Sequence, residues 1–379
     1  MEQVIPFNKP FISGKETEYV VQSMNAGKLC GNGAFTQKCQ SFFQDRYQFQ
    51  RCLLTTSCTD ALEMAALLVN IQPGDEVIMP SYTFVSTANP FLLRGAKIVF
   101  ADSRQDHPGI DEESLLALIT PQTKAIVVVH YAGVACDMDL VMKIANEHGL
   151  FVIEDAAQAI DAFYKDKPLG GIGHLAAFSF HETKNIISGE GGLLVINDQQ
   201  FAARAEIIWE KGTNRSAFFR GEVDKYGWVD IGSSFLPSEL IAAFLYAQLE
   251  NLESIQAKRL YIWNRYFEGL SALSEAGVLA LPVVPEYASN NAHMFYIRLN
   301  SIEQRSALIR TLKESGINAV FHYLSLHKSH LYQDKHDGRA LPYSDQYTDC
   351  LLRLPMYYEL TDQDQHRIIE AIKSFFKSH

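Results

Sequence analysis

Basic residues are scarce in this chain of 379 residues, which has 33 lysines and arginines against 44 aspartates and glutamates. The formal net charge is therefore −11. Proteins that bind nucleic acid or an anionic membrane surface depend on clustered lysine and arginine, so the charge balance argues against both kinds of partner. A local basic pocket that binds a small anionic ligand is still compatible with this net charge.

Cysteines are few as well, and they form no Cys-x-x-Cys pair and no set with histidines at zinc-binding spacing. Such sparse cysteines favour reduced thiols in the cytoplasm over disulfides or a metal site. We therefore expect buried small hydrophobic side chains at all six positions, which are Cys30, Cys39, Cys52, Cys58, Cys136 and Cys350.

Long apolar runs and several enzyme signatures are missing. No stretch approaches the roughly 20 apolar residues of a membrane span, and residues 1–6 lack the features of a secretory signal. Residues 31–36 lack the third glycine of a dinucleotide fingerprint, and residues 181–185 lack the second histidine of a zinc protease. There is no P-loop and no Gly-x-Ser-x-Gly elbow. We therefore expect no nicotinamide, metal, P-loop or serine-hydrolase chemistry.

The chain does contain a repeated alternation of short apolar runs with helix-like stretches. Continuous apolar runs are typical of strands buried on both faces, and their alternation with helices predicts a mostly parallel sheet. The last two runs are too close together for a helical crossover, so we expect that pair to be antiparallel. The runs are residues 52–54, 76–79, 97–101, 125–130, 150–154, 176–180 and 192–196.

The C-terminal part shows a second α/β pattern. A long helical pattern follows Pro237 towards Leu270, and strands are expected at 294–299 and 319–323 with helices at 302–315 and 362–376. Since one core stops growing at roughly 250–300 residues, two domains are expected. We predict a large domain over residues 1–250 and a small α/β domain over 251–379, joined by the long helix. The first thirty residues could pack on either.

Open parallel sheets bind ligands at the carboxyl ends of their strands. After the first strand, residues 55–61 are small and open a helix, which suits either a phosphate site or a plain helix cap. The second strand leads into residues 80–84, whose aromatic side chains could be core or a stacking platform. The fifth ends at Asp155, a costly group to bury unpaired, and Lys184 follows the sixth.

A phosphate site, an aromatic ring, a buried acid and a lysine are what pyridoxal phosphate requires. The acid keeps the pyridine nitrogen protonated, and the lysine bonds to the aldehyde if its surroundings lower its pKa from about 10.4. A lone lysine is ordinarily a solvated surface residue. Lys184 differs because the pattern puts it at the same sheet edge as Asp155.

The ordered set of residues 57–61, 80–83, 154–158, 179–185 and 189–192 resembles the DegT/DnrJ/EryC1/StrS family of sugar aminotransferases. The likeness extends over nearly the whole chain. It implies the aspartate aminotransferase-like fold of a fold type I pyridoxal phosphate enzyme. That fold has a large domain with a mostly parallel seven-stranded sheet and a small C-terminal α/β domain.

The resemblance also implies roles for individual residues. Lys184 would bond to the cofactor and shuttle the proton, and Asp155 would pair with the pyridine nitrogen. The other cofactor contacts that it implies are Phe84 on the ring, Gln158 near the ring hydroxyl, and Thr59, the backbone N–H of Asp60 and Ser179 at the phosphate.

The family builds its sites between two subunits, which implies a homodimer. The partner's segment would lie within residues 211–238, with Asn214 and Arg215 as contacts to phosphate or sugar nucleotide. Many members place an asparagine where this chain has Leu236, so Ser233 or Ser234 would replace its contact with the phosphate.

Residues 322–327 are expected near the substrate, with His322 and Tyr323 as contacts. Ser325 stands where relatives often have proline. His322 and His327 could equally be ordinary polar surface residues.

Within the family, the likeness is strongest to members that aminate TDP-4-keto-6-deoxy-D-glucose to TDP-4-amino-4,6-dideoxy-D-galactose. Glutamate would be the donor, and the product would serve a cell-surface polysaccharide of the enterobacterial common antigen type. The alternatives are formation of a 3-amine and use of a UDP- or GDP-sugar. Dehydrating members have histidine in place of the lysine, and a regulator that senses pyridoxal phosphate would need a basic DNA-binding module.

Overall fold

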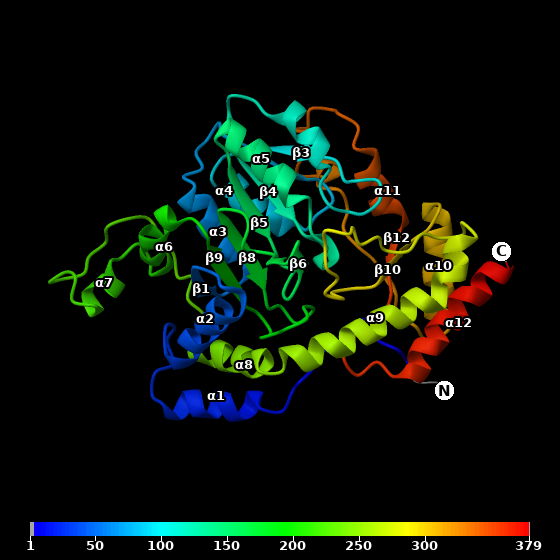
Figure 1. Ribbon diagram of the computed structural model, residues 1–379, viewed down its shortest axis with the longest axis horizontal. Helices are drawn as coiled ribbons and strands as arrows, with labels where there is room; N and C mark the ends of the chain where they lie inside the picture. Colours follow the sequence, from blue (N-terminus) through cyan, green and yellow to red (C-terminus); the bar gives the residue numbers. More distant parts are fainter. Residues whose placement is uncertain (1–3, 379) are drawn as a thin grey trace.

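The computed structural model describes residues 4–378, and its larger part is built around a seven-stranded sheet (Figure 1). The strand order is β1-β9-β8-β5-β4-β2-β3. Strand β9 is antiparallel to both of its neighbours, and the other pairs are parallel, which confirms the predicted sheet and its antiparallel last pair. The strands are β1 (Arg51–Thr55), β2 (Glu76–Pro80), β3 (Lys97–Ala101), β4 (Thr123–Val129), β5 (Phe151–Asp155), β8 (Leu175–Ser179) and β9 (Gly192–Ile196).

Helices cover both faces of this sheet. Alternate residues of each strand enter two separate hydrophobic clusters, because neighbouring side chains on a strand point to opposite faces. One cluster includes α2 (Ala34–Tyr47), α5 (Met138–His148) and α8 (Glu239–Leu249). The other includes α3 (Cys58–Leu68), α4 (Asn89–Leu93) and α6 (Ala202–Trp209). Both faces are buried, as the continuous apolar runs predict.

A smaller sheet lies beyond α9 (Leu252–Glu275), which Figure 1 shows running from the main sheet towards it. Its strand order is β10-β12-β11, and both outer strands are antiparallel to β12. A third hydrophobic cluster joins its strands to α9 and the C-terminal helices. Its elements are β10 (Tyr296–Arg298), α10 (Ile302–Glu314), β11 (Val320–Phe321), α11 (Pro342–Cys350), β12 (Leu351–Arg353) and α12 (Asp362–Ser378).

Two segments connect or extend these parts. A short hairpin is formed by β6 (Phe163–Tyr164) and β7 (Lys167–Pro168). Helix α1 (Glu16–Asn25) packs on α8, whereas Ile5 pairs with Ile317 and joins the third cluster. Residues 4–30 therefore contact both parts of the molecule.

The long helical pattern after Pro237 was expected to be one helix, and this expectation is wrong. The chain leaves the helix at Glu250 and starts α9 at Leu252, and the Asn251 side chain donates to the carbonyl of Ala247 at 2.9 Å. A side-chain amide that bonds the backbone locally competes with helix continuation. Between β3 and β4 the chain forms a 3-10 helix, η2 (Glu112–Leu118). We keep the boundary near residue 250 as a proposal.

All six cysteines are free, and five of them are buried. Cys30 is exposed, which corrects the expectation of six buried thiols. Among residues 4–378, no helix combines the length and the apolar character that a membrane crossing requires.

Candidate active site

A cavity of about 840 Å³ opens at the carboxyl ends of β4, β5 and β8. The smaller sheet and the N-terminal segment complete its walls through Phe321, Arg353 and Phe7. Of the residues expected at the site, the lining includes Thr59, Phe84, Asp155, Gln158, Ser179, Lys184, His322 and Tyr323. It does not include Asp60, Asn214, Arg215, Ser233 and Ser234.

Lys184 lies in the loop that joins β8 to β9 and is half-buried in this cavity. Among residues 4–378, no hydrogen bond or ion pair occupies its Nζ. Burial lowers the pKa of Lys184, and the charge of Arg353 lowers it further, whereas Cys58 and Asp155 act in the opposite direction. A larger share of the amine is therefore neutral and able to react.

Asp155 ends β5 and is 6% exposed. Its carboxylate accepts hydrogen bonds from the Thr87 hydroxyl at 2.7 Å and from the Ala157 N–H at 3.2 Å. Burial raises the pKa of Asp155, although Thr87, Ala157 and Lys184 favour the charged form. A cation beside this carboxylate would stabilise it, as a protonated pyridine nitrogen would.

Glu154, the preceding residue, has a structural role instead. Successive side chains of a strand point to opposite faces, and this carboxylate is fully buried away from the cavity. It accepts hydrogen bonds from His130 Nε2 at 2.9 Å and from the N–H groups of Gly170, Ile172 and Gly173 at 2.6–2.8 Å. It therefore holds the loop that precedes β8.

The start of α3 offers backbone donors to an anion. The Asp60 N–H, expected at the phosphate, instead donates to the capping Ser57 Oγ at 3.0 Å. Among residues 4–378, the N–H groups of Cys58 and Thr59 have no hydrogen-bond acceptor. We therefore move the proposed phosphate contact from the Asp60 N–H to these two N–H groups. A Cβ on Gly192 would lie 2.3–2.5 Å from the Ser57 and Cys58 backbone, so only glycine fits beside this turn.

Phe84 and Gln158 also line the cavity. Phe84 is 54% exposed although it lines the cavity, so its ring is available for stacking. Gln158 is held by the Ala132 N–H, which donates to its Oε1 at 2.6 Å, and by the Tyr323 hydroxyl, which accepts from its Nε2 at 3.0 Å. Its position is therefore fixed from two sides.

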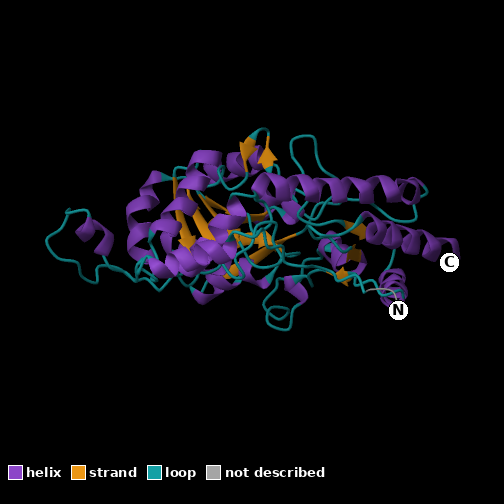
Figure 2. Cartoon of the chain, turned by 90° about the horizontal axis from the view of Figure 1, so that it is seen from below, coloured by secondary structure: helices purple, strands orange, loops and turns teal. Residues whose placement is uncertain are grey.

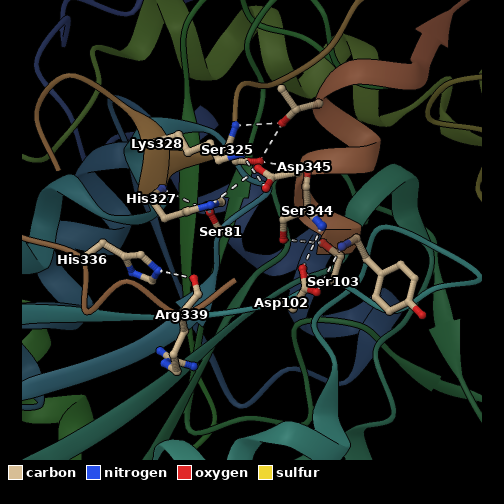
Figure 3. A network of polar contacts seen from close by, with 12 residues as sticks. Ser81, Asp102, Ser103, Ser325, His327, Lys328, His336, Arg339, Ser344 and Asp345 are labelled. Carbon is tan, nitrogen blue, oxygen red and sulfur yellow. Dashed lines mark hydrogen bonds and ion pairs between the residues drawn. The ribbon is translucent and has the colours of Figure 1, made fainter. Parts of the chain in front are cut away.

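The two histidines of residues 322–327 differ in their surroundings. His322 lines the cavity, and its Nδ1 lies 2.5 Å from the Tyr131 hydroxyl. His327 lies outside the lining, with its Nδ1 2.7 Å from Ser81 Oγ and its Nε2 3.5 Å from Asp345 (Figure 3). Both are buried, so neither is an ordinary surface residue.

Ser325 uses the backbone donor that a proline would lack. Its N–H donates to Thr348 Oγ1 at 2.9 Å, and its hydroxyl donates to the Ser344 carbonyl at 2.9 Å. Both contacts join the segment after β11 to α11. Serine at this position therefore adds hydrogen bonds within the smaller part of the molecule.

Three residues of the site escaped the sequence analysis. Thr87 and Arg353 lie in short elements that no motif marks. His293 lines the cavity, and its Nδ1 lies 2.7 Å from Asn185 Oδ1. The Asn185 amide nitrogen already donates to Gln256 and to the Asn291 carbonyl, so His293 Nδ1 is the donor. Only the adjacency of Asn185 to Lys184 could have signalled this contact.

The segment of residues 211–232 projects from the body of the molecule together with α7 (Arg215–Phe219), as Figures 1 and 2 show. We call it the arm. Asn214 ties the arm internally, because its Oδ1 accepts from the Gly227 N–H at 2.8 Å. Trp228 is 83% exposed and Phe219 is 68% exposed. Large apolar side chains exposed in one projecting segment are typical of an interaction surface.

Residues 10–373 match the DegT/DnrJ/EryC1/StrS aminotransferase family. The chain belongs to this family. It is 33% identical over 382 residues to the spore coat polysaccharide biosynthesis protein SpsC of Bacillus subtilis, with 98% of this chain and 97% of the relative covered. Among solved structures, DesV of S. venezuelae is 28% identical with a TM-score of 0.90, and 99% of each chain is covered. Spr1654 from Streptococcus pneumoniae in its PMP form is 25% identical, with the same TM-score and coverage.

Membership of the DegT/DnrJ/EryC1/StrS family makes the chain a sugar aminotransferase, and the family depends on pyridoxal phosphate. The described residues fit that cofactor. An unpaired amine, a buried carboxylate and an exposed aromatic ring line one cavity, and free N–H groups lie at its edge. The predicted fold and cofactor are thereby confirmed.

Proposed function

We propose that this enzyme transfers an amino group from L-glutamate to the keto carbon of TDP-4-keto-6-deoxy-D-glucose. The product would be TDP-4-amino-4,6-dideoxy-D-galactose, whose 4-amine is axial. The observation that carries the transaminase chemistry is the placement of the Lys184 amine and the Asp155 carboxylate in one cavity. The choice of sugar rests on the sequence likeness of residues 27–31, 63–68, 74–89, 130–136, 211–216 and 291–296 to TDP-4-amino-4,6-dideoxygalactose transaminase.

Each residue of the cavity has a distinct task in this proposal. When bound, pyridoxal phosphate supplies an aldehyde that carries the amino group and a ring that accepts electrons. Lys184 Nζ would move the proton from the carbon that bears the donor's amino group to the former aldehyde carbon of the cofactor. The Asp155 carboxylate, oriented by Thr87, would hold a proton on the ring nitrogen. Phe84 and Gln158 would orient the ring, and Thr59 and Ser179 would bind phosphate oxygens.

The partner subunit would complete the site. Asn214, Arg215, Ser233 and Ser234 do not line the cavity of their own chain, and the arm that precedes the two serines projects outward. A homodimer in which each arm reaches the partner's cavity would bring these side chains to the phosphate or to the sugar nucleotide. His322 and Tyr323 would contact the sugar from within the chain.

The product would enter a cell-surface polysaccharide of the enterobacterial common antigen type. The name of SpsC, a spore coat polysaccharide biosynthesis protein, supports a role in glycan synthesis. Six free cysteines suit a reducing compartment, so we place the enzyme in the cytoplasm.

Incubation with L-glutamate and TDP-4-keto-6-deoxy-D-glucose, followed by NMR of the product, tests the proposal. The expected product carries an axial amine at C4, and K184A yields none. Parallel reactions contain the UDP- and GDP-linked 4-keto sugars and a 3-keto sugar. Faster conversion of any of these would overturn the substrate assignment, and an equatorial 4-amine would overturn the stereochemical one.

A further inference from the structure

His293 follows a backbone turn that several hydrogen bonds hold in place. Ala292, the residue before it, has a φ of 50°, in the left-handed region that residues other than glycine seldom adopt. Arg259 donates from Nε to the Ala292 carbonyl at 3.0 Å and from Nη2 to the His293 carbonyl at 2.6 Å. The Asn291 side chain accepts from the His293 N–H at 3.0 Å and donates to the Gln158 carbonyl at 2.8 Å. Such a conformation persists only where its surroundings enforce it, and it is typical of functional sites.

One ring nitrogen of His293 is occupied and the other is free. Nδ1 donates to Asn185 Oδ1 at 2.7 Å, because the Asn185 amide nitrogen already donates to Gln256 and to the Asn291 carbonyl. In a neutral imidazole whose hydrogen is on Nδ1, Nε2 carries a lone pair and can only accept. Among residues 4–378, no hydrogen-bond donor pairs with this nitrogen, and the side chain lines the cavity.

The surroundings of the ring keep it neutral. His293 is 7% exposed. Burial, together with the positive charges of three nearby side chains, holds the pKa of His293 well below its ordinary value. These side chains are Lys184, Arg259 and Arg353. A neutral ring leaves the cavity with a hydrogen-bond acceptor at Nε2, and a buried acceptor without a partner is costly, so we expect a ligand to supply the donor.

The chemistry of the two substrates indicates which donor reaches Nε2. His293 lies close to the reacting Lys184, because it bonds the next residue, Asn185. At that place the amino donor has a carboxylate, which only accepts, and an amine, which is consumed in the bond to the cofactor. In the keto sugar, C5 bears the methyl carbon and the ring oxygen, whereas C3 bears a hydroxyl. The 3-hydroxyl is therefore the hydrogen-bond donor next to the reacting carbon.

We propose that His293 Nε2 accepts a hydrogen bond from the 3-hydroxyl of the keto sugar. This inference rests on the proposed function, because it assumes that the substrate is a 4-keto-6-deoxy sugar. Asn185 fixes the orientation of the ring and Arg259 fixes the backbone, so the acceptor is in place before the sugar binds. A site that is built to bind a hydroxyl rejects an analogue that lacks it, so His293 would select sugars with a hydroxyl beside the keto carbon.

The test is the single-turnover conversion of two sugars by holoenzyme that L-glutamate has first aminated. The sugars are TDP-4-keto-6-deoxy-D-glucose and its 3-deoxy analogue, TDP-4-keto-3,6-dideoxy-D-glucose. We expect the apparent Kd of the wild type to be on the order of 30-fold higher for the analogue, because the buried acceptor is left unpaired. The limiting rates for the two sugars should agree within about threefold, because the 3-hydroxyl does not react.

Two substitutions of His293 separate the cavity acceptor from the structural contact. In H293N, the amide nitrogen can keep the bond to Asn185 while the cavity loses its acceptor, so the preference for the hydroxylated sugar should fall below about threefold. H293Q places an amide oxygen near the position of Nε2 and should retain a preference of about tenfold. Amination of H293N by L-glutamate, followed by the loss of the visible band of bound cofactor, should stay within about threefold of wild type. H148N replaces an exposed histidine at the end of α5 and should behave as the wild type throughout.

The proposal is overturned if H293N keeps the wild-type preference, or if the wild type binds both sugars equally well. It is also overturned if H293N weakens the reactions with L-glutamate and with both sugars to the same extent, since the ring would then serve the lysine or the fold. Failure of the sugar assignment looks different. The wild type would then be aminated by L-glutamate without converting TDP-4-keto-6-deoxy-D-glucose, and the proposed function and this inference would fall together.

Discussion

At the scale of single residues, the surroundings of Lys184 alter the chemistry of its amine. Burial lowers the pKa of Lys184 below the ordinary 10.5, so its neutral form appears at lower pH than in a free lysine. The rate at which added pyridoxal phosphate bonds to the apoenzyme should therefore rise with a midpoint below 10.5. Stopped-flow absorbance over a pH series measures it, with N-acetyl-lysine amide as the control. Equal midpoints for enzyme and control would contradict this account of the amine.

Asp155 gives the second prediction at this scale. D155N keeps the shape of the side chain but removes the negative charge, so turnover should fall on the order of 100-fold or more. T87V keeps the carboxylate and removes one hydrogen bond to it, which should cost about tenfold. Steady-state turnover of both variants, with their cofactor content measured alongside, tests whether D155N loses more activity than T87V. A D155N enzyme within threefold of wild type would show that this carboxylate does not act on the ring.

Sequence reasoning reached Asp155 and Lys184 because each follows a buried strand, where parallel sheets bind ligands. It did not reach Thr87, His293 or Arg353. His293 and Arg353 come to the cavity from a loop and a three-residue strand, and Thr87 comes to Asp155 from a 3-10 turn. None of these elements has a periodic pattern.

At the scale of elements, Glu154 ties strand β5 to the loop before β8. His130 and the N–H groups of Gly173 and Gly170 hold the pKa of Glu154 below its ordinary value, although burial acts against them. E154Q should lower the free energy of unfolding by about 3 kcal/mol at neutral pH, because it replaces a carboxylate on which several donors converge. Denaturant unfolding measures it, with exposed E147Q as a control that should change stability by less than about 0.5 kcal/mol.

The pH dependence of this difference follows from the direction of the shift. A carboxyl whose pKa is lowered on folding contributes stability above its unfolded value of about 4.5, and this contribution is lost as pH falls through the lower folded value. The gap between wild type and E154Q should therefore shrink below pH 4.5. A gap that is constant from pH 7 down to pH 3 would contradict an ionised Glu154.

The seven strands of the main sheet were predictable within a residue or two, because buried parallel strands are continuous apolar runs. Strand β12 was not. It has three residues, one of them charged, and it forms only because β10 and β11 pair on either side of it. The break between α8 and α9 was missed because the apolar pattern continues across it, whereas a side-chain contact of Asn251 accompanies the turn.

At the scale of the whole molecule, the segment between β11 and α11 joins the smaller sheet to the main one. Ser81, which follows β2, meets His327, and Asp102, which follows β3, accepts from the Ser344 N–H at the start of α11 (Figure 3). The same segment contributes Tyr323 and Leu326 to the cavity lining. The contacts therefore join the two parts of the chain beside residues of the site, and the site depends on both parts.

The arm predicts that active sites are shared between subunits. K184A has an intact arm, and the double variant N214A/R215A has an intact Lys184, so each should be inactive alone. When the two variants are mixed, partially unfolded and refolded together, they should form heterodimers that have one complete site each. About half of all dimers should be heterodimers, so the mixture should recover up to about a quarter of wild-type turnover. Separately refolded variants are the control. No recovery in a mixture shown to contain heterodimers would place the arm outside the partner's site.

The covalent attachment of pyridoxal phosphate to Lys184 is the claim on which the chemistry depends. Reduction of the purified holoenzyme with borohydride, followed by peptide mass spectrometry, identifies the modified lysine. We predict phosphopyridoxyl label on the peptide that contains Lys184, and none on that peptide in K184R. Label on another lysine, or an enzyme that retains full turnover in K184R, would contradict the account.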